Sequence, residues 1–146
     1  MILIVDSGST KCDWLAVDSV SGKQLFEKQR TKGLNPAILS RKKLQKTIKK
    51  NELLKANRKT VSHVFFYGAG CGTEKPKLLL KEVLQDIFIN AEISVKEDTY
   101  AAVYATVGVS GDPAVVCIMG TGSNCSYFNG KAIEQNVLMS ALKPKG

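Results

Sequence analysis

The stretch Ile2-Leu3-Ile4-Val5-Asp6-Ser7-Gly8-Ser9-Thr10-Lys11 passes from a short apolar run directly into small and polar residues. A continuous apolar run is typical of a buried strand, and small residues with glycine mark a turn. Residues 14–17 predict a second strand and residues 23–29 a third, joined at Ser21-Gly22. We therefore expect an antiparallel meander at the start of the chain.

Strand and helix patterns alternate after this meander. Ser40 is a suitable N-cap for a basic helix, and residues 74–88 and 99–107 also predict helices. Residues 64–67 and 91–95 predict strands, and residues 115–119 with 125–128 predict a hairpin. A meander followed by alternating strands and helices predicts an α/β fold, a mixed sheet with helices on both faces.

Composition is that of an ordinary single domain. The chain has 146 residues, 44% apolar and 23% charged, enough to build a core. The apolar runs are too short to cross a bilayer, and the start lacks the basic segment of a signal peptide, so we expect a cytoplasmic protein without a membrane. Four scattered cysteines, Cys12, Cys71, Cys117 and Cys125, are then expected as reduced thiols and not as a metal site.

The net charge of +8 is concentrated in one stretch. Residues 41–59 hold nine basic residues and one acid, so the other 127 residues carry 12 charges of each sign. Such a stripe could bind nucleic acid or an acidic partner. No aromatic residues interleave with the lysines, as single-strand binding would require. We therefore favour the solvated face of a helix with Leu44 and Ile48 pointing inward, and do not expect nucleic acid as a partner.

Polar turns that follow apolar strands are the candidate functional positions. Residues 6–11, 68–72 and 120–124 are glycine-rich or hydroxyl-rich, and ligands bind beyond the carboxyl ends of strands in α/β sheets. Backbone N–H groups and hydroxyls there can hold phosphates, and Asp6 can hold Mg²⁺ beside them. Asp98 follows another strand, where it could serve as a general base or as a helix N-cap.

Five motifs in order resemble those of one protein group. These are residues 6–11, Gly33-Leu34-Asn35-Pro36, residues 68–72, the segment Glu97-Asp98-Thr99-Tyr100-Ala101-Ala102, and Gly120-Thr121-Gly122-Ser123-Asn124. Together they resemble the N-acetylglucosamine kinase and BadF/BadG/BcrA/BcrD ATPase group of the actin-like ATPase superfamily. The resemblance covers residues 1–137 and implies a ribonuclease-H-like domain, with residues 138–146 as an irregular tail.

The resemblance implies a role for each motif. Asp98 would be the base that takes the proton of the sugar 6-hydroxyl, and Asp6 would orient Mg²⁺. The phosphates of ATP would be held by two loops, through Gly8, Ser9, Thr10, Lys11, Gly120, Thr121 and Gly122. The amino sugar would be held by Asn35, Gly70, Cys71, Gly72 and Asn124. Ser7 and Ser9 stand where the group more often has glycine.

The chain differs from the group more in its length than in the serines of its first loop. Its members have a second domain of similar size that supplies the adenosine pocket, and the sequence that follows the second phosphate loop here is different. The resemblance thus implies the amino-terminal half of a sugar kinase with little or no activity alone, and an exposed docking face that would favour a homodimer. Two alternatives stay open: an activating ATPase of an acyl-CoA dehydratase, for which Cys117 would be a cluster ligand, and a non-catalytic binding module.

Overall fold

The computed structural model describes residues 1–108, 110–119 and 123–134, and the chain divides into two compact units. The first comprises Met1–Asp98 and the second Thr99–Gly146. Each is described by itself below.

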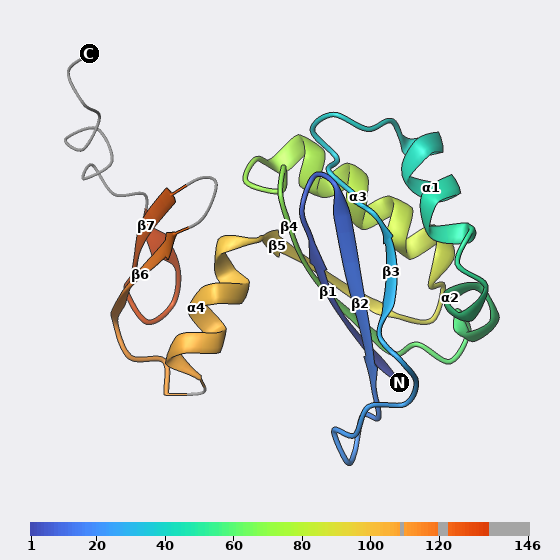
Figure 1. Ribbon diagram of the computed structural model, residues 1–146, viewed down its shortest axis with the longest axis horizontal. Coiled ribbons are helices and arrows are strands. Elements are labelled where there is room, and N and C mark those ends of the chain that lie inside the picture. The colour runs from blue at the N-terminus through green and yellow to red at the C-terminus, as the bar shows by residue number, and fades with distance from the viewer. Residues whose placement is uncertain (109, 120–122, 135–146) are drawn as a thin grey trace. The chain divides into compact units, whose positions relative to one another are not determined.

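A five-stranded mixed sheet organises the first unit (Figure 1). Its strands are β1 (Ile2–Ser7), β2 (Lys11–Val17), β3 (Gln29–Lys32), β4 (His63–Gly68) and β5 (Glu92–Glu97). Their order is β3-β2-β1-β4-β5, with β1 antiparallel to β2 and parallel to β4, and β4 parallel to β5. The expected meander and the mixed α/β class are thus confirmed.

The third strand lies later in the chain than the sequence predicts. It occupies Gln29–Lys32 and not residues 23–29, where one isolated bridge joins Val17 and Gln24. Side-chain contacts explain this register, because Arg30 lies opposite Asp13 and forms two hydrogen bonds with it. The prediction was wrong because cross-strand pairs, which sequence alone does not show, stabilise a short polar strand more than its own composition does.

Three helices accompany the sheet: α1 (Arg41–Lys49), α2 (Glu52–Asn57) and α3 (Glu74–Ile87). Ser40 is the N-cap of α1, as expected, and accepts a hydrogen bond from the Lys43 N–H. Leu44 and Ile48 are buried, which confirms the inward face of the basic helix. The expectation of a single helix for the basic stretch at residues 41–59 was wrong, because the stretch is divided between α1 and the six-residue α2, which begins after its own N-cap, Asn51.

One apolar cluster fills the space between the sheet and these helices. Alternate residues of the central strands contribute to it, among them Leu3, Val5, Trp14 and Phe66, all fully buried. The helices contribute buried side chains to the same cluster, so they cover one face of the sheet (Figure 1). The polar ends of the strands therefore project from a rigid base.

The second unit contains α4 (Thr99–Val107), β6 (Ala114–Met119), β7 (Ser123–Phe128) and the short β8 (Ile133–Glu134). The helix has the bounds that the sequence predicts, and β6 and β7 form the expected antiparallel hairpin. Gly120, Thr121, Gly122 and the expected tail at residues 138–146 lie outside the described residues. Within the described residues, no helix is both long enough and apolar enough to cross a membrane.

The hairpin carries a disulfide bond between Cys117 and Cys125. The two residues face each other in the register of β6 and β7, with their Cα atoms 4.1 Å apart. The expectation of reduced thiols is therefore wrong for this pair. It is confirmed for Cys12 and Cys71, which are free and buried.

Candidate active site

The carboxyl ends of the three parallel strands meet at one edge of the first unit's sheet. Ser7 of β1 lies beside Gly68 of β4, and Gly68 lies beside Glu97 of β5. The turn after β1, the loop after β4 and Asp98 consequently start from the same row. This is the juxtaposition that the end-of-strand rule predicts.

A buried serine connects the turn after β1 to the loop at residues 33–35. The Ser7 hydroxyl accepts a hydrogen bond of 2.9 Å from the Leu34 N–H, and both residues are fully buried. Sequence reasoning treated Ser7 only as a replacement for glycine. Its position in the strand could have predicted its burial, since Leu3, Val5 and Ser7 alternate on the buried face.

Two glycines allow the loops to approach this closely. A Cβ atom at Gly33 would overlap the backbone of Gly8 and Ser9, so any side chain there would push the two loops apart. Gly70 has φ +80°, a left-handed conformation, and a Cβ atom there would overlap Oδ1 of Asn35. The predicted segments at residues 6–11, 33–36 and 68–72 are thus in direct contact.

The Asn35 side chain is held in a fixed orientation by two hydrogen bonds. Its Nδ2 donates to Oγ of Ser9 at 3.2 Å, and its Oδ1 accepts from the Ala37 N–H at 3.0 Å. A primary amide has two donors and two acceptor lone pairs, so one of each remains for a ligand hydroxyl. This contact joins the predicted sugar residue Asn35 to the predicted phosphate residue Ser9.

Asp6 lies in a negative environment. Partial burial raises the pKa of its carboxyl group, the neighbouring carboxylates of Asp13 and Asp98 raise it further, and Lys11 and Lys28 partly oppose them. Asp6 and Asp98 are therefore close enough for their charges to interact, although 92 positions separate them in the sequence. Among the predicted site residues these are the two carboxylates, and the structure brings them together.

Asp13, directly opposite Asp6 in the register, has the reverse shift. Hydrogen bonds from Arg30 lower the pKa of the Asp13 carboxyl group to about 2, and Lys28 lies 3.5 Å away. Its charge is thus neutralised by two cations. Asp6 is the carboxylate of this pair that stays available for a cation from solution.

The loop after β4 lies beside Asp98. Cys71 is buried, and the pKa of its thiol rises to about 12 because of this burial, with the carboxylates of Asp98 and Glu97 adding to the effect. A Cβ atom at Gly72 would lie 3.3 Å from the nearer carboxylate oxygen of Glu97. A thiol with this pKa stays protonated, so Cys71 can contribute packing and a weak donor but not a nucleophile.

The remaining predicted residues belong to the second unit. Gly120, Thr121 and Gly122 lie outside the described residues, and Asn124 is described only as a backbone position paired with Ile118. Among the described residues, no three His, Cys, Asp or Glu side chains gather as a metal site would require. Cys117 is bonded to Cys125, which leaves no free thiol at that position for an iron–sulfur cluster.

Two solved structures place this fold in a known class. The whole chain matches a candidate N-acetylglucosamine kinase from Porphyromonas gingivalis with a TM-score of 0.80 and 36% sequence identity, and it spans 49% of that chain. It also matches, over its whole length, an inorganic polyphosphate/ATP-glucomannokinase from Arthrobacter sp. strain KM, with a TM-score of 0.59, 20% identity and 66% of that chain covered. The chain therefore has the ribonuclease-H-like fold of the actin-like ATPase superfamily.

Within this superfamily the match at 36% identity, which extends over every residue of the chain, confirms the resemblance to the N-acetylglucosamine kinase group. The chain spans about half the length of the Porphyromonas gingivalis protein. No protein-family model matches the sequence, and no curated protein matches it.

Proposed function

We propose that this chain forms the amino-terminal half of an ATP-dependent sugar kinase that phosphorylates N-acetylglucosamine, or a related hexosamine, at its 6-hydroxyl. The observation that carries the proposal is the electrostatic coupling of Asp6 and Asp98 at the edge where the loops of Ser9, Asn35 and Gly70 contact one another. The match to the Porphyromonas gingivalis protein supports the choice of sugar.

Asp98 is the proposed general base. Its carboxylate would accept the proton of the 6-hydroxyl while that oxygen attacks the γ-phosphorus of ATP, and ADP would leave with the electrons of the broken bond. Asp98 comes directly after β5, at the carboxyl edge of the sheet, beside the loop that holds Cys71. This position suits a group that must contact a sugar bound across the strand ends.

Asp6 is the proposed Mg²⁺ ligand, and its surroundings fit a divalent cation. Partial burial raises its pKa first, repulsion from Asp13 and Asp98 adds to the effect, and a cation would relieve that repulsion. Mg²⁺ commonly takes one or two carboxylates together with substrate phosphates, so a three-residue cluster is not required. When bound, Mg²⁺ would offset negative charge on the phosphates of ATP.

The backbone around Gly8, with Ser9, Thr10 and Lys11, would hold the terminal phosphates together with residues 120–122. Asn35 would bind a sugar hydroxyl through the donor and acceptor that its two internal hydrogen bonds leave over. The Ser9–Asn35 bond would then keep the sugar and the phosphates in a fixed relation, and such positioning supplies much of the catalysis in phosphoryl transfer.

Calorimetric titration of the 146-residue protein with N-acetylglucosamine, followed by MgATP, tests the binding half of this proposal. We expect the sugar to bind, and Asn35→Ala to weaken its binding about tenfold or more, because the variant loses two proposed hydrogen bonds of about 1 kcal/mol each. Asn90→Ala is the matched control, since Asn90 is exposed and its side chain bonds the Lys59 carbonyl, away from the predicted sugar residues. Equal weakening by both variants, or no sugar binding at all, would contradict the assignment.

Transfer of labelled γ-phosphate under single-turnover conditions, measured in a full-length context that includes the second domain of the group, tests the base. Asp98→Asn should lower the rate of transfer by about 10²–10⁴-fold while sugar affinity stays nearly unchanged. Glu92→Gln, at the other end of β5, should leave the rate unaltered. Transfer at the original rate by Asp98→Asn would show that another group takes the proton, and a chain that binds sugar without any transfer would restrict the proposal to sugar binding.

A further inference from the structure

A groove of about 270 Å³ lies in the first unit between strand β3 and helix α1, apart from the candidate active site. Cationic side chains line both of its walls. Lys32 comes from β3, and Lys43, Lys46 and Lys50 come from α1 and its C-cap. These four are called the groove lysines below, and Thr47 lies among them.

Internal charge pairing reaches two arginines near the groove but not the groove lysines. Arg41, on the same helix, pairs with Glu82 and Asp86 of α3, and Arg30 pairs with Asp13. Within the described part of the chain, the groove lysines have no carboxylate within 4.0 Å, and no acidic residue lines the groove. Two arginines near the groove thus have internal counter-charges, whereas the four groove lysines have none among the described residues.

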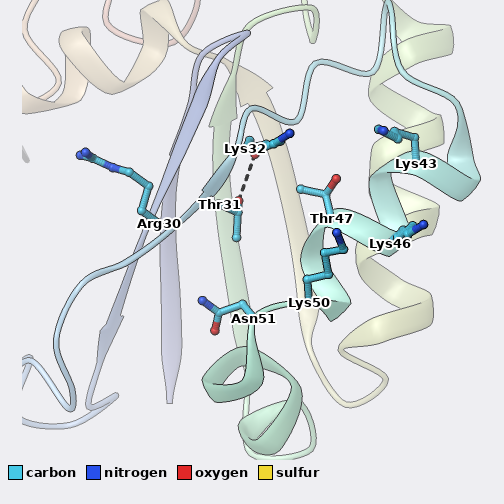
Figure 2. A pocket seen from close by; sticks show the side chains of 8 residues that line it. All are labelled: Arg30, Thr31, Lys32, Lys43, Lys46, Thr47, Lys50 and Asn51. Carbon is cyan, nitrogen blue, oxygen red and sulfur yellow. Dashed lines mark hydrogen bonds between the residues drawn. The ribbon is translucent and has the colours of Figure 1, made fainter.

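Figure 2 shows how these side chains lie. The amines of Lys32 and Lys43 point toward each other across the groove, and the amine of Lys50 rises beside Thr47. Arg30 points away from them, in keeping with its pairing to Asp13. The amine of Lys46 points away from the other three in this view. The like charges of Lys32, Lys43 and Lys50 repel one another, and a polyanion between them would convert that repulsion into attraction.

The lining selects the kind of anion. Among the described residues, no aromatic side chain lines the groove, so nucleic-acid bases would have no stacking surface there. The same lining offers no apolar side chain that could anchor a peptide. Lysine amines are point charges suited to phosphate oxygens, and the Thr47 hydroxyl can add a hydrogen bond. The groove's volume of about 270 Å³ is slightly below the range of about 300–1,000 Å³ that is typical of small-molecule sites.

From these observations we infer that the groove between β3 and α1 binds a small, multiply charged phosphate compound. This inference uses neither the candidate active site nor the proposed kinase activity. Two kinds of compound have this chemistry: an inorganic phosphate chain and a phosphate ester of a small metabolite.

Calorimetry on the 146-residue protein at about 150 mM salt, with tripolyphosphate and with a hexose bisphosphate as separate probes, tests the inference. We expect saturable binding of one probe or both, and the tighter probe identifies the source. Lys43→Gln with Lys50→Gln should weaken binding at least about tenfold. The control Lys23→Gln with Lys75→Gln removes the same charge from two exposed lysines outside the groove and should change affinity less than about twofold.

Four results would overturn the inference. They are the absence of binding by both probes, equal weakening in the two double variants, loss of binding in Thr10→Ala, and tighter binding of a single-stranded oligonucleotide with the same lysine dependence. The second would indicate general charge attraction, the third binding at the candidate active site, and the fourth a nucleic-acid surface. Because the substituted lysines are exposed, thermal melting should show that all variants remain folded.

Discussion

Residues 1–98, all of which the structure describes, form five strands and three helices around one continuous apolar cluster, and their two cysteines are free. The described part of residues 99–134 buries Val103, Val116 and Phe128 as its own cluster, and a disulfide crosses its hairpin. A small core contributes little stability, and covalent links are a common replacement for it. The comparison indicates that apolar burial stabilises the first unit, whereas the described part of the second unit combines a smaller core with a covalent cross-link.

Truncation of the first unit's core should give the largest effect. Trp14 is fully buried, its ring lies 6.2 Å from that of Phe88, and its Nε1 donates to the Thr31 hydroxyl. Trp14→Ala should lower the free energy of unfolding by about 3–5 kcal/mol, because it opens a cavity and leaves Thr31 without this partner. Denaturant unfolding measures the change.

Ile38→Ala is the control for this truncation, since Ile38 is 71% exposed and should change the stability by less than about 0.5 kcal/mol. Comparable losses in the two variants would show that apolar burial is not what stabilises residues 1–98.

The same contrast explains which parts of the fold the sequence could predict. Strands that alternate or run continuously apolar, such as β1 and β4, and helices with a clear apolar stripe, such as α3, were predicted close to their observed positions because burial selects them. Strand β3 was misplaced because side-chain pairs across strands hold it. The division of residues 41–59 into α1 and α2 was missed because the basic pattern continues across the break.

The candidate active site also has features that the sequence could predict and features that it could not. The edge on which Asp6, residues 68–72 and Asp98 meet follows from strand direction, so a sequence can predict it. The contact of Asn35 with Ser9 and the buried Ser7–Leu34 bond depend on loop conformations that only tertiary packing sets. The Cys117–Cys125 disulfide was missed for a related reason, since a hairpin shifted by one residue would separate the two cysteines.

Removal of the disulfide should have a smaller effect, confined to the second unit. Cys117→Ser with Cys125→Ser, or reduction by a dithiol, should destabilise the hairpin by about 2–3 kcal/mol, since the closed loop is short. Hydrogen exchange of β6 and β7 amides should accelerate while that of β1 and β4 stays constant. The double variant Cys12→Ala with Cys71→Ala is the contrasting control, because both thiols lie in the first unit's core and should affect only that unit. Faster exchange throughout residues 1–98 after reduction would contradict the proposed division of stability.

The smallest expected effect concerns Asp6 and Asp13, which lie opposite each other in the first unit and have opposite pKa shifts. The pKa of Asp13 is about 2 in the folded protein against an ordinary 3.8, so its contribution to stability is present above pH 3.8 and is lost as the pH falls toward 2. Asp13→Asn should therefore lower stability at neutral pH, and the difference from the unsubstituted protein should disappear in that acid range. Asp6 has a raised pKa, so its ionised form costs stability as the pH rises above 3.8.

Asp6→Asn should consequently leave stability unchanged or slightly higher at neutral pH, while it weakens MgATP binding if the proposed role is correct. Denaturant unfolding at several pH values between 2 and 7 compares the two variants, and added salt should reduce both effects because the groups are partly exposed. If Asp6→Asn were the more destabilising variant at neutral pH, Asp6 would be part of the structural framework. The expected result is that ionised Asp6 lowers the stability of the folded protein whereas ionised Asp13 raises it. A ligand site would show this contrast, because a carboxylate placed to bind a ligand need not be placed where it stabilises the fold.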